Sequence, residues 1–424
     1  MNHPLPPQTE MAAWVGLDWA DQQHVVSLQA ADSPRIESQL LRQKPEALQE
    51  WINSLRERFS GRPVAVALEQ SRGPLLYALM STDFLILYPI NPKTLAKYRE
   101  SLYPSGAKDD PRDADLLREL IQRFASRFRA WKPEDPATRQ LQLLVQHRRK
   151  LCHEKTRLTN QLTIYLKSYF PQALEWVGEL DSYQACDFLQ RWPTLSALQK
   201  ATPGRIRKFY RLHHCHSTSL IDSRLAQIRQ ARPLTEDPAV VEAFSLMVKS
   251  RVGPLRPLLE SLAELDRRLQ KLFDQHPDHD IFASFPAAGP VLGPRLLSAL
   301  GSDRTRFTQA SELQNFSGVA PVTKQSGRTR IVSMRWACPR FLRQTFVEYA
   351  AASCGKSEWA RTFYALKAQQ RMKHHAILRE LAFKWIRIIL RCWQNRTPYV
   401  EAQYLAQLQK RKFQGRGAVL RMTG

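Results

Sequence analysis

"AAWVGLDWA", residues 12–20, opens the part of this 424-residue chain whose pattern decides the fold. Its apolar run ends at Asp18, as expected for a buried strand with a carboxylate at its end. A helical periodicity lies at 46–59, and further strand patterns lie at 24–30, 37–42, 63–69 and 83–91. Three strands, followed by alternating helices and strands, predict a mixed α/β sheet that a helix from about Pro111 completes.

This order of elements is that of a ribonuclease H-type sheet, which we assign to a first domain, residues 1–132. Asp135 and Pro136 then have the residue types of a helix N-cap and a first helical residue. The helix that follows, and a second one over about 238–275, carry leucines near heptad spacing. We therefore expect a second domain, 133–280, built on a long antiparallel helical hairpin that forms a coiled coil.

The helical hairpin contains two interruptions. Pro254 and Pro257 are expected to kink or split its second helix. Residues 171–237 have the pattern of a smaller helical insert with the basic stretch "GRIRKFYRLHH". The leucine stripe has two explanations that the sequence leaves open, a core within one chain or a contact between chains. The last residues, 281–424, predict a mainly helical domain with a short hairpin.

Charge gives the strongest indication of a partner. The formal net charge is +24, and the residues from Pro321 onward carry 21 Lys or Arg against 4 Asp or Glu, which places +17 in the last quarter of the chain. Tryptophan and phenylalanine are interleaved with these cations, as in surfaces that bind a phosphate backbone. General solubility or an anionic membrane surface would not confine the excess to one segment. We expect a nucleic-acid partner and no membrane.

The sequence favours a cytoplasmic protein. The longest apolar stretch, "FLILYPI" at 84–90, is far shorter than the roughly 20 residues of a membrane helix. No secretory signal pattern opens the chain. The six cysteines have no paired spacing, which suits reduced thiols. The cluster "HHCH" at 213–216 lacks a second ligand pair at zinc-finger spacing, so a solvated polar stretch explains it better than a zinc site.

Four acids of the first domain lie where this fold could bring them together into a cluster that binds a cation. Asp18 and Glu69 end two strand patterns that can approach each other, and Asp110 and Asp113 lie three residues apart near a helix start. Adjacent carboxylates repel by about 4 kcal/mol per pair at about 4 Å in an effective dielectric of about 20. Such a cluster therefore implies Mg²⁺ or Mn²⁺, which supports in-line attack on phosphodiesters. Taken singly, each acid has a structural explanation, such as an N-cap for Asp110 before Pro111.

These motifs resemble the DEDD insertion-sequence transposases, which combine a RuvC-like N-terminal domain with a serine-bearing C-terminal domain. The family is understood as bridge-RNA-guided recombinases. Its D-x-x-D-A core selects Asp110 and Asp113 over Asp109 and Asp115. The matching stretches are "VGLDWA" (15–20), "VALEQSRGPL" (66–75), "YPINPKTLAKYRESL" (88–102), "KDDPRDADLL" (108–117), "FASFPAAGPVLGPRLLSALG" (282–301), "FSGVAPVTKQSGRTR" (316–330) and "GKSEWARTFYALK" (355–367).

The resemblance implies a second chemical group, Ser326 in "KQSGR", as the catalytic serine. From the residues alone, Ser326 and Gly327 predict the turn of a short hairpin that exposes the hydroxyl, and a plain hairpin serine is the structural alternative. A serine hydroxyl is a weak nucleophile without a base or a metal. No base is nearby in sequence, so activation would come from the metal-bearing domain. Lys324, Arg328 and Arg330 are expected to hold the scissile phosphate.

A possible further DNA contact lies in "FPAAGPVLG", residues 285–293. This segment resembles the P-G-x-G turn of a helix-hairpin-helix, whose backbone amides grip a phosphate. Ala287 replaces the first glycine, so the contact expected at Gly289 is weakened. The other expected nucleic-acid contacts are Lys108, Arg112 and Arg335.

The predicted function is that of a transposase that cuts and rejoins donor and target DNA. Ser326 would form a phosphoserine intermediate, and no ATP is expected because the covalent bond conserves the phosphodiester energy. The resemblance implies a noncoding guide RNA, and joining two duplexes implies a homodimer or homotetramer. Three alternatives stay open: a metal-dependent junction-resolving nuclease that uses the acids alone, a non-catalytic nucleic-acid-binding protein, and a sugar-kinase-like fold, which the lack of glycine-rich phosphate loops disfavours.

Overall fold

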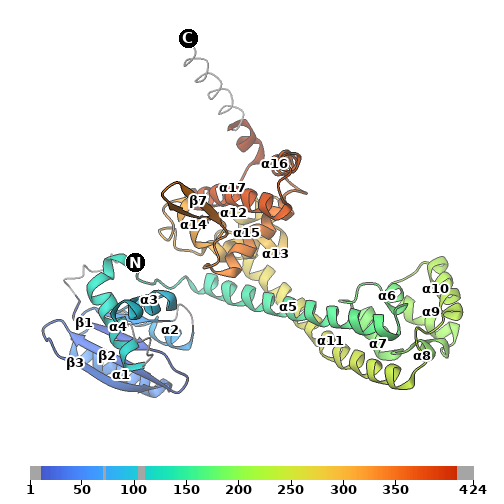
Figure 1. Cartoon of the computed structure of the whole chain (residues 1–424), viewed down its shortest axis with the longest axis horizontal. Helices are drawn as coiled ribbons and strands as arrows, with labels where there is room; N and C mark the ends of the chain where they lie inside the picture. The colour runs from blue at the N-terminus through green and yellow to red at the C-terminus, as the bar shows by residue number, and fades with distance from the viewer. Residues whose placement is uncertain (1–10, 70–72, 104–109, 408–424) are drawn as a thin grey trace, which may run out of the picture. The chain divides into compact units, whose positions relative to one another are not determined.

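The computed structural model describes residues 11–69, 73–103 and 110–407. They divide into two compact units between Pro133 and Glu134, coloured blue to cyan and green to red in Figure 1. Within the described residues, no helix is both long enough and apolar enough to cross a membrane. The division into three domains expected from the sequence stays a prediction.

The first unit is built on a five-stranded sheet with the strand order β3-β2-β1-β4-β5. β1 pairs antiparallel with β2 and parallel with β4, which confirms the mixed sheet. The strands are β1 (Ala13–Asp18), β2 (Gln23–Ala30), β3 (Ile36–Arg42), β4 (Val64–Leu68) and β5 (Leu85–Pro89). The helices are α1 (Pro45–Arg58), α2 (Pro74–Leu79), α3 (Pro92–Leu102) and α4 (Asp110–Phe124), with a 3-10 turn, η2 (Ala125–Arg127), after α4.

Different helices cover the two faces of this sheet. Val15 and Leu17 point into one buried cluster with the apolar residues of α1 and α2, whereas α3 and α4 pack on the other face against Ala67. Gly16 lies where α4 crosses β1, because a Cβ built on it would be 1.9 Å from the carbonyl oxygen of Ala114. A side chain at this position would therefore push the helix off the strand.

The second unit begins with a long helical hairpin, α5 (Pro136–Tyr169) and α11 (Pro238–Asp274). Arg148 of α5 forms an ion pair with Asp266 of α11. Nearer the turn of the hairpin, the rings of Tyr165 and Phe244 lie 6.0 Å apart. The two pairs run in opposite sequence order, so the helices are antiparallel, as predicted. Coiled-coil packing between them stays a prediction.

The ends of these helices follow from local sequence, and the second helix is continuous through its two internal prolines. The Asp135 side chain accepts a hydrogen bond from the backbone N–H of Thr138 at 3.0 Å, which confirms the N-cap of α5. α11 continues through Pro254 and Pro257, so the expectation that they split it is wrong. Both prolines are exposed, and water can bond the carbonyl groups that lose a helical donor.

The insert between α5 and α11 forms a helical cap with its own core. Apolar residues of the insert, including Trp176 and Phe188, pack against Leu162 of α5 and Val248 of α11. The cap helices are α6 (Ala173–Trp176), α7 (Tyr183–Arg191), α8 (Leu195–Gln199), α9 (Pro203–Leu212) and α10 (Thr218–Gln230).

The rest of the second unit forms a helical body around the other end of the hairpin. Its core is centred on fully buried Trp385, whose indole N–H donates to Ser353 Oγ at 2.8 Å, and includes Leu141 of α5 and Phe273 of α11. The elements are α12 (His279–Ala283), α13 (Gly289–Leu300), α14 (Ala310–Phe316), β6 (Val322–Ser326), β7 (Thr329–Ser333), α15 (Arg340–Ser353), α16 (Glu358–Gln369) and α17 (His374–Asn395).

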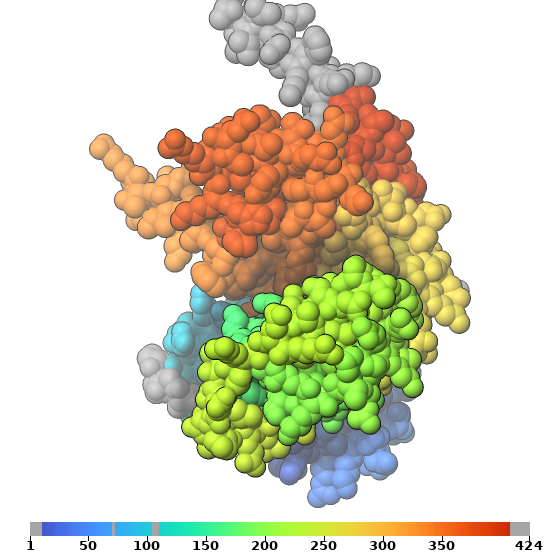
Figure 2. Space-filling view, turned by 90° about the vertical axis from the view of Figure 1, so that its right-hand side faces the viewer, coloured from blue at the N-terminus to red at the C-terminus, as the bar shows by residue number. Residues whose placement is uncertain are grey.

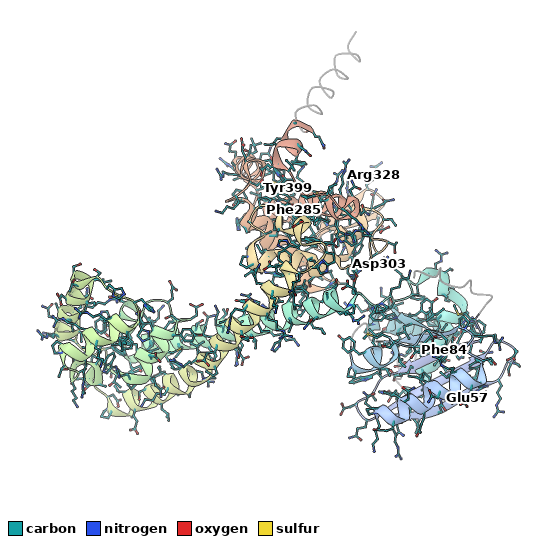
Figure 3. The ribbon with its side chains drawn as sticks, turned by 180° about the vertical axis from the view of Figure 1, so that it is seen from behind. Glu57, Phe84, Phe285, Asp303, Arg328 and Tyr399 are labelled. Carbon is teal, nitrogen blue, oxygen red and sulfur yellow. The ribbon has the colours of Figure 1, made fainter. Side chains whose placement is uncertain are left out.

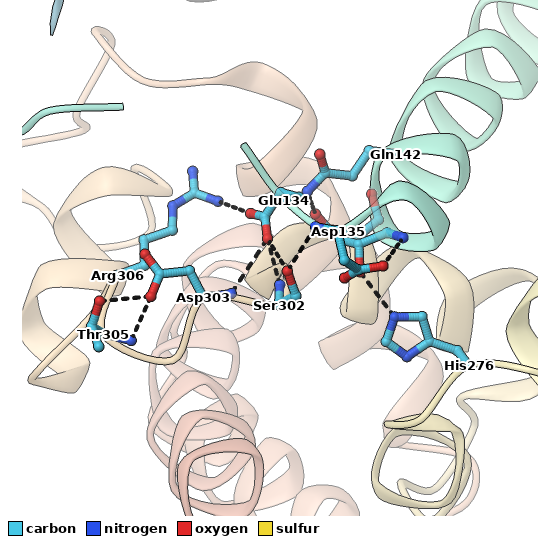
Figure 4. Close-up of polar contacts among 10 residues, drawn as sticks. Glu134, Asp135, Gln142, His276, Ser302, Asp303, Thr305 and Arg306 are labelled. Carbon is cyan, nitrogen blue, oxygen red and sulfur yellow. Dashed lines mark hydrogen bonds and ion pairs between the residues drawn. The ribbon is translucent and has the colours of Figure 1, made fainter. Parts of the chain in front are cut away.

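Glu134, just before α5, is held by the loop that follows α13 (Figure 4). One of its carboxylate oxygens accepts hydrogen bonds from the backbone N–H of Ser302 at 2.6 Å and from Ser302 Oγ at 2.7 Å. Gly301 has φ +79°, and a Cβ there would lie 2.1 Å from Glu134 Oε1. Both the backbone conformation and the close approach require glycine, so this loop fixes the position where α5 begins.

Candidate active site

Two of the four predicted acids follow neighbouring parallel strands. Leu17 of β1 is paired with Leu68, the last residue of β4, and each of these leucines is followed by an acid, Asp18 at the end of β1 and Glu69 just after β4. Both acids therefore lie at the same edge of the sheet, at the carboxyl ends of these strands. The Asp18 side chain is buried and that of Glu69 is half-buried.

α4 carries the third acid to the covered face of this sheet. Asp113 lies in the first turn of α4 and is 1% exposed. Side chains alternate along a strand, so Asp18 points to the same face as Gly16, the face that α4 crosses. The packing of α4 on β1 thus directs Asp113 and Asp18 to one face of the sheet.

The donor chemistry of this edge suits a hard divalent cation, because carboxylate oxygens are the ligands that Mg²⁺ and Mn²⁺ take. In the described parts of the chain, however, no three acid, histidine or cysteine side chains gather closely enough to hold a metal ion. The predicted four-acid metal site is therefore not assembled in this arrangement, and the roles of Asp18, Glu69, Asp110 and Asp113 stay predictions.

A cation of the protein itself lies beside the most buried acid. Nε of Arg99, on α3, is 2.9 Å from Oδ1 of Asp113, and the Arg99 side chain is 15% exposed. Charge compensation of this kind is what makes a buried carboxylate tolerable. Arg99 was not among the predicted site residues, although it lies in the "YPINPKTLAKYRESL" stretch. It could have been found, because a carboxylate expected to be buried implies a cationic side chain on a neighbouring helix or strand.

The remaining aspartates of this segment have different surroundings. Asp110 is exposed and is the first residue of α4, so the expectation that it caps a helix starting at Pro111 is wrong by one position. Proline is tolerated throughout the first turn, where the N–H groups have no helical acceptor. Asp115 accepts a hydrogen bond from Ser27 Oγ at 2.5 Å, beside buried Arg118, whose pKa is lowered by desolvation. Asp115 thus ties α4 to β2, and Asp109 lies outside the described residues.

Ser326 lies at the end of a hairpin strand, one position before the turn. Ser326 pairs with Thr329, so the turn residues are Gly327 and Arg328, and the predicted turn was displaced by one residue. Gly327 has φ +54°, which the first central position of a two-residue hairpin turn requires. Figure 3 shows Arg328 at the outer edge of the body.

The strand register separates the three cations expected to hold the phosphate. Lys324 pairs with Ile331 and Ser326 with Thr329, and these pairs point to one face. Arg330 pairs with Gln325 on the opposite face. Lys324 therefore shares the face of Ser326, Arg330 does not, and Arg328 lies in the turn.

The other predicted nucleic-acid contacts are scattered. Arg112 is exposed, with its guanidinium 5.4 Å from the ring centre of Tyr103. The guanidinium of Arg335 donates to Asn315 Oδ1 at 3.0 Å, which ties the end of the hairpin to α14. Gly289 is exposed at the start of α13. Lys108 lies outside the described residues.

The turn before α13 keeps a left-handed backbone despite the missing glycine. Ala287 has φ +64° and Gly289 has φ +46°. Alanine adopts this conformation at a cost of about 1–2 kcal/mol. Both the helix-hairpin-helix resemblance of this turn and a phosphate contact at Gly289 stay predictions.

Two family models match the chain, one on each side of the helical cap. A transposase family of the IS110 DEDD type matches residues 15–171, and a transposase family of IS116, IS110 and IS902 matches residues 279–365. On both sides of the helical cap, the chain is therefore similar to transposases of the IS110/IS116 type. The first match includes Asp18, Glu69 and Asp113, and the second includes Ser326.

Individual proteins of insertion elements show the same similarity. The chain is 26% identical to the mini-circle putative transposase for IS117 of Streptomyces coelicolor, over 95% of this chain and 98% of that protein. It is 29% identical to putative transposase y4uE of Sinorhizobium fredii, over 47% of this chain and 57% of that protein. It is 28% identical to an uncharacterized 43.6 kDa protein of insertion element IS110 of Streptomyces coelicolor, over 70% and 73% of the two chains.

Proposed function

We propose that this IS110/IS116-type transposase cuts and rejoins DNA through a phosphoserine intermediate at Ser326. The observation that carries the proposal is the placement of Asp18 and Glu69 at adjacent strand ends, on a sheet whose crossing helix carries Asp113. A divalent cation held by these acids and Asp110 would have to draw them closer together, and it would then supply stabilisation of charge on the phosphate oxygens. The mixed five-stranded sheet is consistent with the RuvC-like fold that the resemblance implies.

The chemical step conserves the number of phosphodiester bonds. Ser326 Oγ attacks phosphorus, an O–P bond forms, the deoxyribose oxygen leaves with the bond electrons, and the serine proton passes to a base. Residues 321–335 contain no Asp, Glu or His, so this base comes from outside the hairpin. A deoxyribose hydroxyl of the partner strand then attacks the phosphoserine and restores the serine. Lys324, on the face of Ser326, stabilises the charge that develops on the phosphate.

The proposal also includes a noncoding guide RNA as a partner and an active assembly of more than one chain. The basic C-terminal segment provides charge for a noncoding guide RNA as well as for DNA. Joining a donor duplex to a target duplex requires two sets of reacting groups, so the active assembly is a homodimer or homotetramer. Light scattering of the chain with and without RNA and DNA measures this state directly.

The decisive experiment detects the covalent intermediate. Full-length protein is incubated with the noncoding RNA that flanks its gene, Mg²⁺ and cognate DNA, and we expect a protease-sensitive DNA adduct. Ser326→Ala abolishes the adduct. Ser333→Ala, the same change on the same face of the hairpin, retains it.

Each alternative predicts a different result. A junction-resolving nuclease would cleave without an adduct, would survive Ser326→Ala and would lose cleavage with Asp113→Asn. A non-catalytic nucleic-acid-binding protein would retain every measurable activity in both variants. Either result refutes the phosphoserine mechanism.

A further inference from the structure

The β6–β7 hairpin leaves both of its faces uncovered. Every residue of the two strands is exposed except Val322, which is half-buried. Ile331 and Val332 are each 58% exposed, and they point to opposite faces. The narrow orange projection from the body in Figure 2 corresponds to this hairpin. A two-stranded ribbon without cover is only marginally stable in water, so a bound partner would stabilise it.

The charge of the hairpin identifies the chemistry of that partner. Residues 321–335 contain four cations and no acid. One face carries Lys324, the other carries Arg330, and the tip carries Arg328. Among the residues that the structure describes, no acid forms an ion pair with these three side chains. A Cβ on Gly327 would meet nothing within 4 Å, so the tip is open as well.

We infer that this hairpin enters the major groove of duplex DNA tip first. Each face of the ribbon then lies against one of the two sugar-phosphate backbones, the walls of the groove. The inference rests on the proposed function, because it assigns the strand that Ser326 attacks to the wall on the Lys324 face. A ribbon with side chains on both faces is about 10 Å thick, which fits a major groove about 12 Å wide but not a minor groove about 6 Å wide. The major groove of A-form RNA is too narrow to admit it.

This placement gives each cation a separate task. Lys324 binds a phosphate next to the one that Ser326 attacks, and Arg330 binds the opposite strand across the groove. Arg328, at the tip, faces the base edges, where a guanidinium can donate to guanine O6 and N7. Ile331 and Val332 lie three and four residues from Arg328, so they face the sugar-phosphate backbone near the mouth of the groove and not the base edges.

The test combines variants of the full chain with a groove-selective block. The probe is a 30-base-pair DNA duplex, prepared plain, with glucosylated hydroxymethylcytosine to fill the major groove, or with netropsin in the minor groove. We expect Lys324→Ala and Arg330→Ala each to weaken binding to the plain duplex several-fold and to lower the slope of log K against log salt by about 1. Lys249→Ala, at an exposed lysine of α11, is the matched control and retains the wild-type affinity.

The two blocked duplexes distinguish binding in the major groove from binding in the minor groove. Glucosylation should abolish the difference between wild type and the two variants, whereas netropsin should leave it unchanged. The inference would be overturned by the reverse pattern or by a loss of affinity in Lys324→Ala alone. It would also be overturned by an equal loss in Lys249→Ala or by the same losses on an RNA duplex. Ser326→Ala should bind the plain duplex normally and form no adduct, so failure of the serine mechanism and failure of groove entry give different results.

Discussion

The acid-bearing edge of the first unit and the serine-bearing hairpin of the second are built in opposite ways. Asp18 and Asp113 are buried, and the contact of α4 with β1 positions them. Ser326 is exposed, and one two-stranded ladder positions it. Substitutions at the acid edge should therefore change folding stability together with activity. Substitutions on the hairpin should change activity or binding alone.

The largest expected effect comes from Gly16→Ala, which tests how firmly α4 fixes the acid edge. The added Cβ would lie 1.9 Å from the carbonyl oxygen of Ala114 and 2.5 Å from the backbone nitrogen of Arg118. These are backbone atoms, so α4 must move as a whole. We expect a loss of about 4 kcal/mol in the unfolding free energy of the first unit, measured by hydrogen exchange of β1 and α4 amides.

The matched control is Gly204→Ala in α9, where a Cβ meets nothing within 4 Å. There alanine should stabilise the helix by about 0.5–1 kcal/mol, because it lowers the conformational entropy of the unfolded chain. Equal protection of β1 in wild type and Gly16→Ala would show that the helix is not held against the strand, and the contrast between the two regions would fail.

Arg99→Gln should have the next largest effect. It removes the guanidinium 2.9 Å from buried Asp113 and leaves that charge without this compensation. The expected loss is about 3 kcal/mol in the unfolding free energy of the first unit. Addition of Asp113→Asn to Arg99→Gln should recover most of it, because the charge that needs compensation is then gone.

Arg56→Gln provides the comparison on the surface of the same unit. Its guanidinium lies 2.7 Å from Asp83, but both side chains are largely exposed, so the loss should be below about 0.5 kcal/mol. The pKa of Asp83 is lowered by the hydrogen bond from Arg56, so this small contribution disappears as pH falls through the pKa of Asp83. If Arg56→Gln and Arg99→Gln cost the same, burial does not set the strength of the acid-edge pair.

Local signals predicted much of this molecule. The apolar runs predicted β1, β2, β4 and β5, and Asp135 with Pro136 predicted the start of α5, because a strand pattern and a cap depend on residues close in sequence. For the same reason, the apolar runs that precede Asp18 and Glu69 were enough to place both acids at strand ends. The similarity to IS110/IS116 transposases was also carried by short contiguous stretches.

The remaining features depend on contacts between distant residues or on solvent. Arg99 reaches Asp113 from another helix. Glu134 accepts a hydrogen bond from Ser302, which is 168 residues away in the sequence. No periodicity encodes such pairs. The prolines of α11 were expected to kink or split the helix, and the split did not occur because both prolines are exposed, which the sequence did not show. Ser326 was placed in the turn because glycine fits either central position, and only the pairing of Ser326 with Thr329 decides between them.

The smallest expected effect is on the hairpin, where Val332→Thr should change stability by less than about 0.5 kcal/mol. Val332 is exposed, so the hydroxyl of threonine stays in water, and both residues are β-branched and suit a strand. The same substitution at Val26, which is fully buried in β2, places a hydroxyl in an apolar core and should cost about 2 kcal/mol. Urea unfolding of both variants measures the difference. A comparable loss at Val332 would mean that the hairpin is already covered in the free protein, and the groove of DNA would then have no open face to bind.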